Sequence, residues 1–312
     1  MQRTMNRPPI NPYLVLLIGV ISVSTSAILV KLSSAPAPIT AMYRLVFSVL
    51  LMLPFVMGNV RKEITTITRR DFTYSAIAGV FLAFHFILWF ESLEYTSVAS
   101  SVVLVTLQPI FAFIGTFLFY KERFTTAALI SSAMAIAGSI VISWGDFRID
   151  GMALFGDFLA LMGAVMVTGY FLFGQTVRRN TSLLAYTFVV YGISSITLIL
   201  YNLMLRNPFF TYPTSDWIMF LLLAIVPTLL GHSLFNWALK WLSTSVISMS
   251  ILFEPIGASI LAWLILDESI KATQWIGGLL VISGLLLFYY MEKMKQRQIA
   301  QNTSETFDRL AD

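Results

Sequence analysis

The sequence predicts an all-α integral membrane protein with ten transmembrane helices, arranged as two five-helix repeats of opposite orientation. Three observations predict this fold: a composition too apolar for water, ten long apolar runs, and matching residues in the two halves of the chain. Of the 312 residues, 57% are hydrophobic and only 12% are charged, whereas soluble domains carry about 25% charged residues. A soluble chain of this size could not bury so much apolar surface, so lipid must be its main solvent.

Each apolar run is long enough to cross a hydrocarbon core, which takes about 20 helical residues. The connectors between the runs are short and hold most of the charges, and residues 293–312 form a polar tail. The first run could be taken for a signal peptide, but it is too long for the apolar region of such a peptide. The expected spans are residues 12–33, 37–58, 71–92, 97–120, 125–145, 153–175, 182–204, 215–238, 244–266 and 273–292.

The distribution of Lys and Arg predicts the orientation. With the N-terminus inside, the inner segments hold 15 of the 20 residues of these two types and the outer segments hold 3, while Lys31 and Arg44 lie in or near the membrane. This excess predicts that both termini are cytoplasmic, in the cytoplasmic membrane of a prokaryote. It also supports ten spans, because one missing helix would invert every later connector.

The net charge and the absence of cysteine limit which partners can be expected. The net charge of +4 is modest and fits the loops of a membrane protein, so we expect no nucleic-acid partner. The chain has no cysteine, which excludes disulfides and thiolate metal sites. We expect no metal and no cofactor, and either a monomer or a homodimer.

The second half of the chain repeats the first. A shift of 146 residues aligns residues 91–122 with residues 237–268, and a shift of about 144 aligns earlier positions. The expected repeats are residues 12–145 and 153–292, and each contains five helices. Because five is odd, the halves cross the membrane in opposite directions, as in many secondary transporters, whose substrate site lies near the midplane. Duplication that serves only the structure is the alternative. The aligned pairs include Gly19 with Gly163, Pro109 with Pro255, and Gly138 with Gly284.

An ionisable residue and a proline lie together halfway along the ninth span. Glu254 and Pro255 have Gln108 and Pro109 as their repeat mates. Proline removes a backbone donor and bends the helix, which is tolerable in lipid only where protein or water covers the freed carbonyl. A carboxyl group at mid-membrane usually faces a cavity. We therefore predict that Glu254 and Gln108 bind substrate and that the two prolines are hinges; a structural kink with a hydrogen-bonded Glu254 is the alternative.

Few other polar side chains lie inside the apolar spans. An arginine that faces inward requires an anion or carbonyl groups, although it could also be a structural tie, and a membrane histidine can serve packing alone. Lys31 lies near the outer end of its helix, where its long side chain can reach water. The remaining candidates for substrate binding are Ser24, Arg44, His85, Trp89, Thr168, His232 and Asn236.

Four segments resemble the paired EamA repeats of the drug/metabolite transporter superfamily: residues 41–54, 85–123, 155–171 and 235–269. The resemblance implies a ten-helix bundle with a central cavity lined mainly by helices one, three, four, six, eight and nine. Members of the superfamily move small organic solutes, often outward. Some residues at matching positions of the two repeats differ in type; for example, His232 aligns with Phe86. We therefore expect an asymmetric cavity.

We therefore expect a secondary transporter, an exporter of small organic metabolites such as amino acids or drug-like amphipathic solutes. A carboxyl group at Glu254 could bind and release protons, so protons are an expected second partner besides the solute and the bilayer. The alternatives are a passive, channel-like permease, a structural membrane subunit and an intramembrane enzyme. No HExxH or GxGD motif supports an enzyme.

Overall fold

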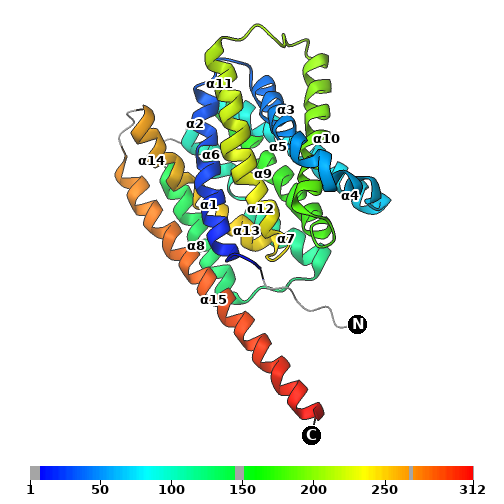
Figure 1. Ribbon diagram of the computed structural model, residues 1–312. Coiled ribbons are helices and arrows are strands. Elements are labelled where there is room, and N and C mark those ends of the chain that lie inside the picture. The colour runs from blue at the N-terminus through cyan, green and yellow to red at the C-terminus, as the bar shows by residue number, and fades with distance from the viewer. Residues whose placement is uncertain (1–7, 145–150, 267–269, 312) are drawn as a thin grey trace.

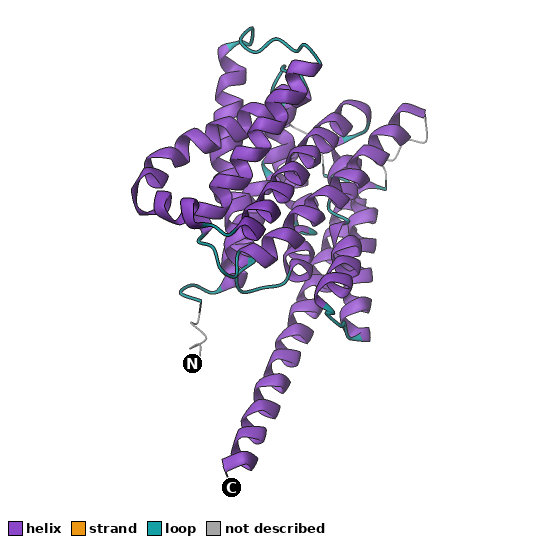
Figure 2. Cartoon of the chain, turned by 90° about the vertical axis from the view of Figure 1, so that its right-hand side faces the viewer, coloured by secondary structure: helices purple, strands orange, loops and turns teal. Residues whose placement is uncertain are grey.

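The computed structural model describes residues 8–144, 151–266 and 270–311, and every regular element in these ranges is helical. Figures 1 and 2 show the helices packed side by side in a bundle from which the end of α15 projects. In chain order the elements are α1 Pro12–Ser24, α2 Ser26–Lys31, α3 Ala37–Phe55, the π-helical η1 Val56–Val60, α4 Arg61–Thr66, α5 Arg69–Tyr95, α6 Val98–Val105, α7 Gln108–Tyr120, α8 Thr126–Ser143, α9 Gly151–Val177, α10 Leu183–Met204, α11 Thr214–Leu223, the π-helical η2 Ala224–His232, α12 Ser233–Ala238, α13 Thr244–Ile251, α14 Glu254–Leu266 and α15 Ala272–Ala311.

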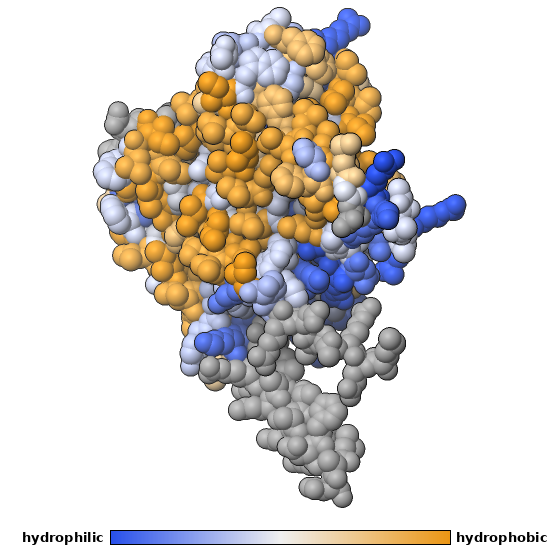
Figure 3. Space-filling model, in the orientation of Figure 1, coloured by the Kyte–Doolittle hydropathy of each residue, from blue (hydrophilic) through white to orange (hydrophobic). Residues whose placement is uncertain are grey.

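The predicted membrane-spanning architecture is confirmed. Nine helical stretches of the described chain are long and apolar enough to cross a membrane, and α8 supplies a shorter apolar helix, Thr126–Ile142, at the expected fifth span. On the face that Figure 3 shows, apolar residues form a broad band, and the most polar residues lie near its margins. Bulky side chains stand exposed on the spans, such as Leu118 and Leu286, at 56% and 66% exposure, as expected where lipid is the solvent.

Polar residues in the connectors determine where several helices begin. The side-chain oxygen of Ser, Thr or Asn at such a position accepts a hydrogen bond from a backbone N–H that the first helical turn leaves free. The residues that cap helices in this way are Asn11, Thr68, Ser97, Thr125 and Ser182.

Helix contacts follow the predicted repeat. The third span, α5, packs along α9; its repeat mate is the eighth span, α11 to α12, and the η2 and α12 parts of that span pack along α1. The fifth and tenth spans, α8 and α15, pack against each other. Their contact is close because both repeat-related glycines lie in it: a Cβ on Gly138 would lie 2.6 Å from the backbone nitrogen of Val281, and one on Gly284 would lie 2.7 Å from that of Ala135. The two halves therefore meet as an inverted pair.

The ends of the bundle are distinguished by its connectors. The start of α1 and the end of α15 lie at one end, and the α10–α11 connector lies at the other (Figure 1). We call these the terminal end and the opposite end. Most of the predicted outer connector at residues 144–151 lies outside the described residues, as do Arg148 and Glu268.

Two segments differ from the sequence-based expectation. The connector after α3 contains the short helix α4, and the carboxylate of Glu63 in α4 accepts a hydrogen bond at 2.7 Å from the backbone N–H of Ser182, before α10. The polar tail is helical, because α15 continues to Ala311.

Candidate functional site

The two mid-membrane prolines follow short interruptions of the fourth and ninth spans, each of which otherwise runs as one helical stretch. The fourth span ends as α6 at Val105 and restarts as α7 at Gln108, and the ninth ends as α13 at Ile251 and restarts as α14 at Glu254. Pro109 and Pro255 are the second residues of the new helices. A proline in a first helical turn costs little, because its missing N–H would have no partner in the helix anyway. The chain can therefore turn away from the helix axis just before each proline.

The breaks place unpaired backbone groups beside one central cavity. Val105 and Ile251, which end the first half of each span, both line this cavity. Among the backbone hydrogen bonds described at the breaks, none is accepted by the carbonyl of either residue. The second halves begin at the same place, and the start of a helix carries free N–H groups and a partial positive charge. Backbone donors and acceptors thus surround the cavity.

Arg44 of α3 is fully buried beside this cavity. Its Nε donates to Oγ1 of Thr228 at 2.6 Å, and one Nη donates to Oγ of Ser26 at 2.9 Å. The guanidinium carbon lies 4.1 Å from the ring centroid of Phe86, a cation–π contact that helps to offset its desolvation. The other Nη has no partner among the described residues, so this buried cation retains a free donor.

A proline in the eighth span positions one partner of Arg44. Pro227 lies inside η2, where it has no N–H to donate to the carbonyl four residues earlier, that of Leu223. The hydroxyl of Thr228 donates to this carbonyl at 2.8 Å and accepts the hydrogen bond from Arg44. The π-helical turn around the proline therefore holds the threonine hydroxyl towards α3.

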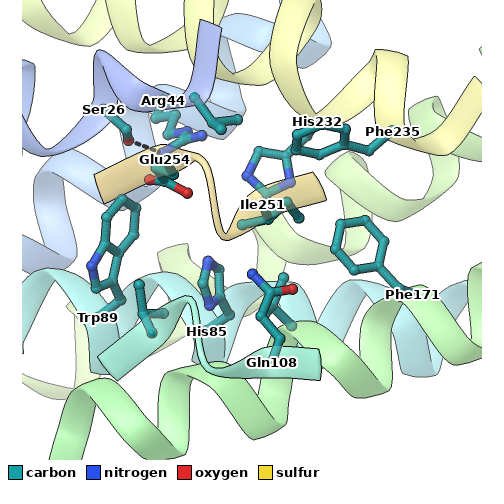
Figure 4. A pocket seen from close by; sticks show the side chains of 13 residues that line it. Ser26, Arg44, His85, Trp89, Gln108, Phe171, His232, Phe235, Ile251 and Glu254 are labelled. Atoms are coloured by element: carbon teal, nitrogen blue, oxygen red, sulfur yellow. Dashed lines mark hydrogen bonds between the residues drawn. The ribbon is translucent and has the colours of Figure 1, made fainter. Parts of the chain in front are cut away.

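Glu254 faces the same cavity and is 6% exposed. Figure 4 shows its carboxylate and the Arg44 guanidinium on one side of the cavity, with Ser26 behind them. Within the described chain, no hydrogen bond or ion pair joins the Glu254 carboxylate to another side chain, whereas its backbone carbonyl accepts a bond at 3.4 Å from Ser24. A buried acid and a buried base thus border one space without pairing with each other.

The two histidines meet at the junction of the repeats. His85 of α5 binds the carbonyl of Gly163 through Nδ1 at 2.9 Å; because a carbonyl only accepts, Nδ1 carries the hydrogen, and Nε2 of a neutral ring is an acceptor. His232 of η2 packs edge-on against Phe86, its repeat mate, with ring centroids 5.4 Å apart. The Nδ1 atom of His232 is buried without a partner among the described residues. Two residues at matching positions of the repeats can touch only near the pseudo-twofold axis that relates the repeats. The contact between Phe86 and His232 therefore places these rings at that axis.

Two more predicted residues reach the cavity from the first repeat. Gln108, the mate of Glu254, is 4% exposed, and its Oε1 has no partner in the described structure. Trp89 lies one turn beyond His85, and its ring stacks on the imidazole with centroids 5.7 Å apart. The cavity therefore combines an amide, an aromatic wall and ionisable groups.

Three other candidate residues do not line the cavity. The Ser24 hydroxyl donates to the carbonyl of Val20 at 2.9 Å, and Thr168 donates to that of Ala164 at 2.8 Å, so both hydroxyls satisfy their own helices. The amide of Asn236 donates instead to the Tyr170 hydroxyl. Lys31 is exposed at the opposite end of the bundle, as expected for a lysine that reaches water, and its Nζ also donates to the carbonyl of Leu93.

One polar lining residue, Ser26, and two aromatic lining residues were not predicted from the sequence. Ser26, two positions after Ser24, reaches the cavity because α1 ends at Ser24 and α2 begins at Ser26, which changes the face that each serine presents. Phe171 and Phe235 supply aromatic walls. No signal in one sequence separates these rings from ordinary packing residues.

The cavity is closed in this conformation. Its volume is about 20 Å³, room for roughly one water molecule, whereas small-molecule sites measure about 300–1,000 Å³. At the opposite end, Asp216 accepts hydrogen bonds from the N–H and the hydroxyl of Ser34, at 2.9 and 2.8 Å. Towards the terminal end, Oε1 of Gln175 accepts two from Thr244, both at 2.7 Å. The cavity is thus too small to hold an organic solute unless the surrounding helices move apart.

Comparison with known proteins identifies the family. The sequence matches the EamA-like transporter family over residues 10–144 and again over residues 154–290. The chain belongs to this family. The curated relatives of this EamA protein include an uncharacterized transporter of Archaeoglobus fulgidus, 23% identical over 245 residues, which span 78% of this chain and 83% of the relative. Another is the uncharacterized transporter YxxF of Bacillus subtilis, 25% identical over 238 residues, or 76% of each chain.

A solved crystal structure shares the fold. It aligns with this EamA chain at a TM-score of 0.72 and 18% identity, over 91% of this chain and 98% of the other. Together with the family match, this confirms the resemblance to EamA repeats. The protein is a multi-pass membrane transporter and not an enzyme. Among the described residues, no cluster of His, Asp and Glu could hold a metal ion.

Proposed function

We propose that this EamA protein is a secondary transporter that exports small organic metabolites, such as amino acids or drug-like amphipathic solutes, by alternating access to the central cavity. The observation that carries the proposal is the unpaired acid and base at mid-membrane. Arg44 keeps a free Nη donor and Glu254 keeps a free carboxylate, and both line the cavity where the two repeats meet.

The groups around the cavity favour a solute with a carboxylate and a cationic or donor group. The free Nη of Arg44 and the starts of α7 and α14 favour negative charge. The carboxylate of Glu254 favours a cation or a donor. Trp89, Phe171 and Phe235 would contact an apolar part of the solute. Binding would satisfy buried polar atoms that lack partners in the closed form.

Closure of the cavity favours alternating access over a continuously open permease. Hydrogen bonds join helices on both sides of the cavity, which has room for about one water molecule. Both sides must therefore open in turn, and the inverted repeat offers two related conformations for this. We further propose that both termini face the cytoplasm of a prokaryotic cell, because the terminal end carries the excess of Lys and Arg.

Glu254 is the group we propose for proton coupling. It would bind a proton when the cavity faces one side and release it when the solute takes its place. Glu254→Gln should then fold normally and retain downhill exchange but lose the pH dependence of transport. Glu91→Gln is the matched control, because Glu91 lies at the opposite end of the bundle and does not line the cavity.

Counterflow in proteoliposomes tests both parts of the proposal. Labelled amino acids and amphipathic cations would be screened, and the rate for any solute that exchanges would be measured from about pH 5.5 to about pH 8.5. Saturable counterflow by the parent supports a carrier. An unchanged rate and pH profile in Glu254→Gln would make Glu254 a structural tie and the protein a passive facilitator. Arg44→Lys, which keeps the charge but loses the forked geometry, should weaken the exchange of carboxylate-bearing solutes about tenfold or more.

A further inference from the structure

A second hollow lies on the outside of the bundle, between α5, α7 and α9, and has a volume of about 450 Å³. It shares no lining residue with the central cavity. We call it the lateral groove; the lining residues that matter here are Arg70, Tyr74, Phe119, Tyr120, Phe173 and Arg179. It is far larger than the closed central cavity and belongs to no step of the proposed transport.

The floor of the lateral groove is apolar and faces lipid. Phe81 packs flat over α9 because Gly169 has no side chain, and a Cβ there would lie 2.9 Å from the phenyl ring. The rings of Phe81 and Phe173 stack with centroids 5.9 Å apart. Phe119 on α7 is 68% exposed, as suits a residue that contacts hydrocarbon. An acyl chain would find aromatic surface on several sides.

Two exposed arginines border the groove, each at the end of its helix. Arg70 lies in the first turn of α5, with its guanidinium carbon 5.3 Å from the ring centroid of Tyr74. Arg179 lies just beyond α9, 5.7 Å from the ring of Tyr120. Neither guanidinium pairs with a carboxylate in the described chain. Two cations thus stand unneutralised above an apolar groove.

The tyrosine beside Arg179 is held in place. The Tyr120 hydroxyl bonds the Leu172 carbonyl at 2.5 Å and lies 2.7 Å from Oγ1 of Thr176, so both contacts are with α9. The ring is therefore fixed against α9, and it offers a fixed surface to the guanidinium of Arg179, which lies 5.7 Å from it. Because the Tyr120 ring is already fixed, less side-chain conformational entropy is lost when an anion binds beside it.

We propose that the lateral groove binds an anionic phospholipid, with its phosphate between Arg70 and Arg179 and an acyl chain along the aromatic floor. Guanidinium groups bind phosphate through paired hydrogen bonds. Basic pockets between transmembrane helices at the cytoplasmic side are typical sites for anionic lipid head groups. A soluble phosphate would use only the two cations, whereas a lipid also covers the exposed aromatic rings. The site is independent of the transported solute.

Thermal unfolding of the full-length protein in a neutral detergent tests this lipid site. The unfolding midpoint would be followed as phosphatidylglycerol, or phosphatidylcholine with the same acyl chains, is added. We expect phosphatidylglycerol to raise the midpoint more strongly. In the double variant Arg70→Gln/Arg179→Gln, its apparent affinity should fall about 30-fold, because each basic residue near the head group contributes about fivefold.

Arg69→Gln is the matched control, because Arg69 is exposed in the same helical turn but does not line the groove. It should bind phosphatidylglycerol as the parent does. The proposal is overturned if phosphatidylcholine stabilises the parent equally, if the double variant keeps its affinity, or if Arg69→Gln loses as much as the double variant. Glycerol phosphate tests whether a soluble anion is sufficient. If it alone raised the unfolding midpoint as much as phosphatidylglycerol does, the two arginines would bind a free anion and the lipid site would be refuted.

Discussion

Replacing Gly138 by alanine should destabilise this protein, although alanine is the better helix former. The added Cβ would lie 2.6 Å from the backbone nitrogen of Val281 and 2.7 Å from the carbonyl oxygen of Gly277. Both atoms belong to the backbone of α15 and cannot turn aside as a flexible side chain would. The two helices must therefore separate along their contact.

The expected size of the effect follows from two opposing terms. Alanine in place of glycine favours a helix by about 1 kcal/mol, whereas overpacking a close contact costs about 1–3 kcal/mol. Gly192, in the middle of α10, is the matched control, because a Cβ there meets no atom within 4 Å. Gly192→Ala should stabilise by up to about 1 kcal/mol. Gly138→Ala should lose up to about 2 kcal/mol after both terms are combined, so that the variants differ by the overpacking cost of about 1–3 kcal/mol.

Reversible unfolding in mixed micelles, by titration with a denaturing detergent, measures these free energies. Gly284→Ala should resemble Gly138→Ala, because its Cβ would meet the backbone nitrogen of Ala135 at 2.7 Å. The double variant should cost less than the sum, since helices already separated by one methyl group accommodate the second. Equal stabilities for Gly138→Ala and Gly192→Ala would refute the close approach of α8 and α15, and with it this reasoning.

Three further outcomes are expected. Pro109→Ala and Pro255→Ala should unfold near the parental temperature but exchange solute more slowly in proteoliposomes, because the prolines lie in first turns, where they favour the breaks and where alanine removes no backbone hydrogen bond; parental rates in both variants would contradict a hinge role. A cysteine at Phe210 should react with an impermeant maleimide on intact cells and one at Lys240 should not, and the reverse pattern would invert the proposed orientation. Asp216→Asn weakens the two hydrogen bonds that Asp216 accepts from Ser34, so hydrogen exchange in residues 31–36 should become faster, and unchanged exchange would show that another contact holds this segment.

The architecture could be predicted from the sequence because a bilayer places simple requirements on the helices that cross it. A helix in lipid must be apolar over about 20 residues, so span positions can be read directly. The second span was expected at residues 37–58, and the structure has a helical stretch over Ala37–Gly58. Inverted repetition could be read because one shift of 146 residues aligns Pro109 with Pro255 and Gly138 with Gly284, and because each half holds an odd number of spans.

The site was less predictable, because small changes in backbone geometry decide which side chains reach the cavity. Ser24 and Ser26 are two residues apart, and only the break at Thr25 directs the second towards Arg44. Pro227 gave no warning that a π-helical turn would place Thr228 against the guanidinium. Charged residues were easier to identify, since a buried Arg44 or Glu254 is costly enough to indicate a special environment by itself.

The contact between Phe86 and His232 has a consequence for how the protein rests between transport events. If the two repeats were identical, exchanging their roles would leave the energy unchanged, and the two facing directions would be equally populated. Each unlike pair of mates removes this degeneracy, and a difference of about 1.4 kcal/mol already gives a tenfold preference for one direction. Phe86 and His232, which meet on the axis, form one such unlike pair. Gln108 and Glu254, which begin the helices after the two breaks, form another. The resting direction is therefore set by a few substitutions on a symmetric frame, and it can be reversed without altering the fold.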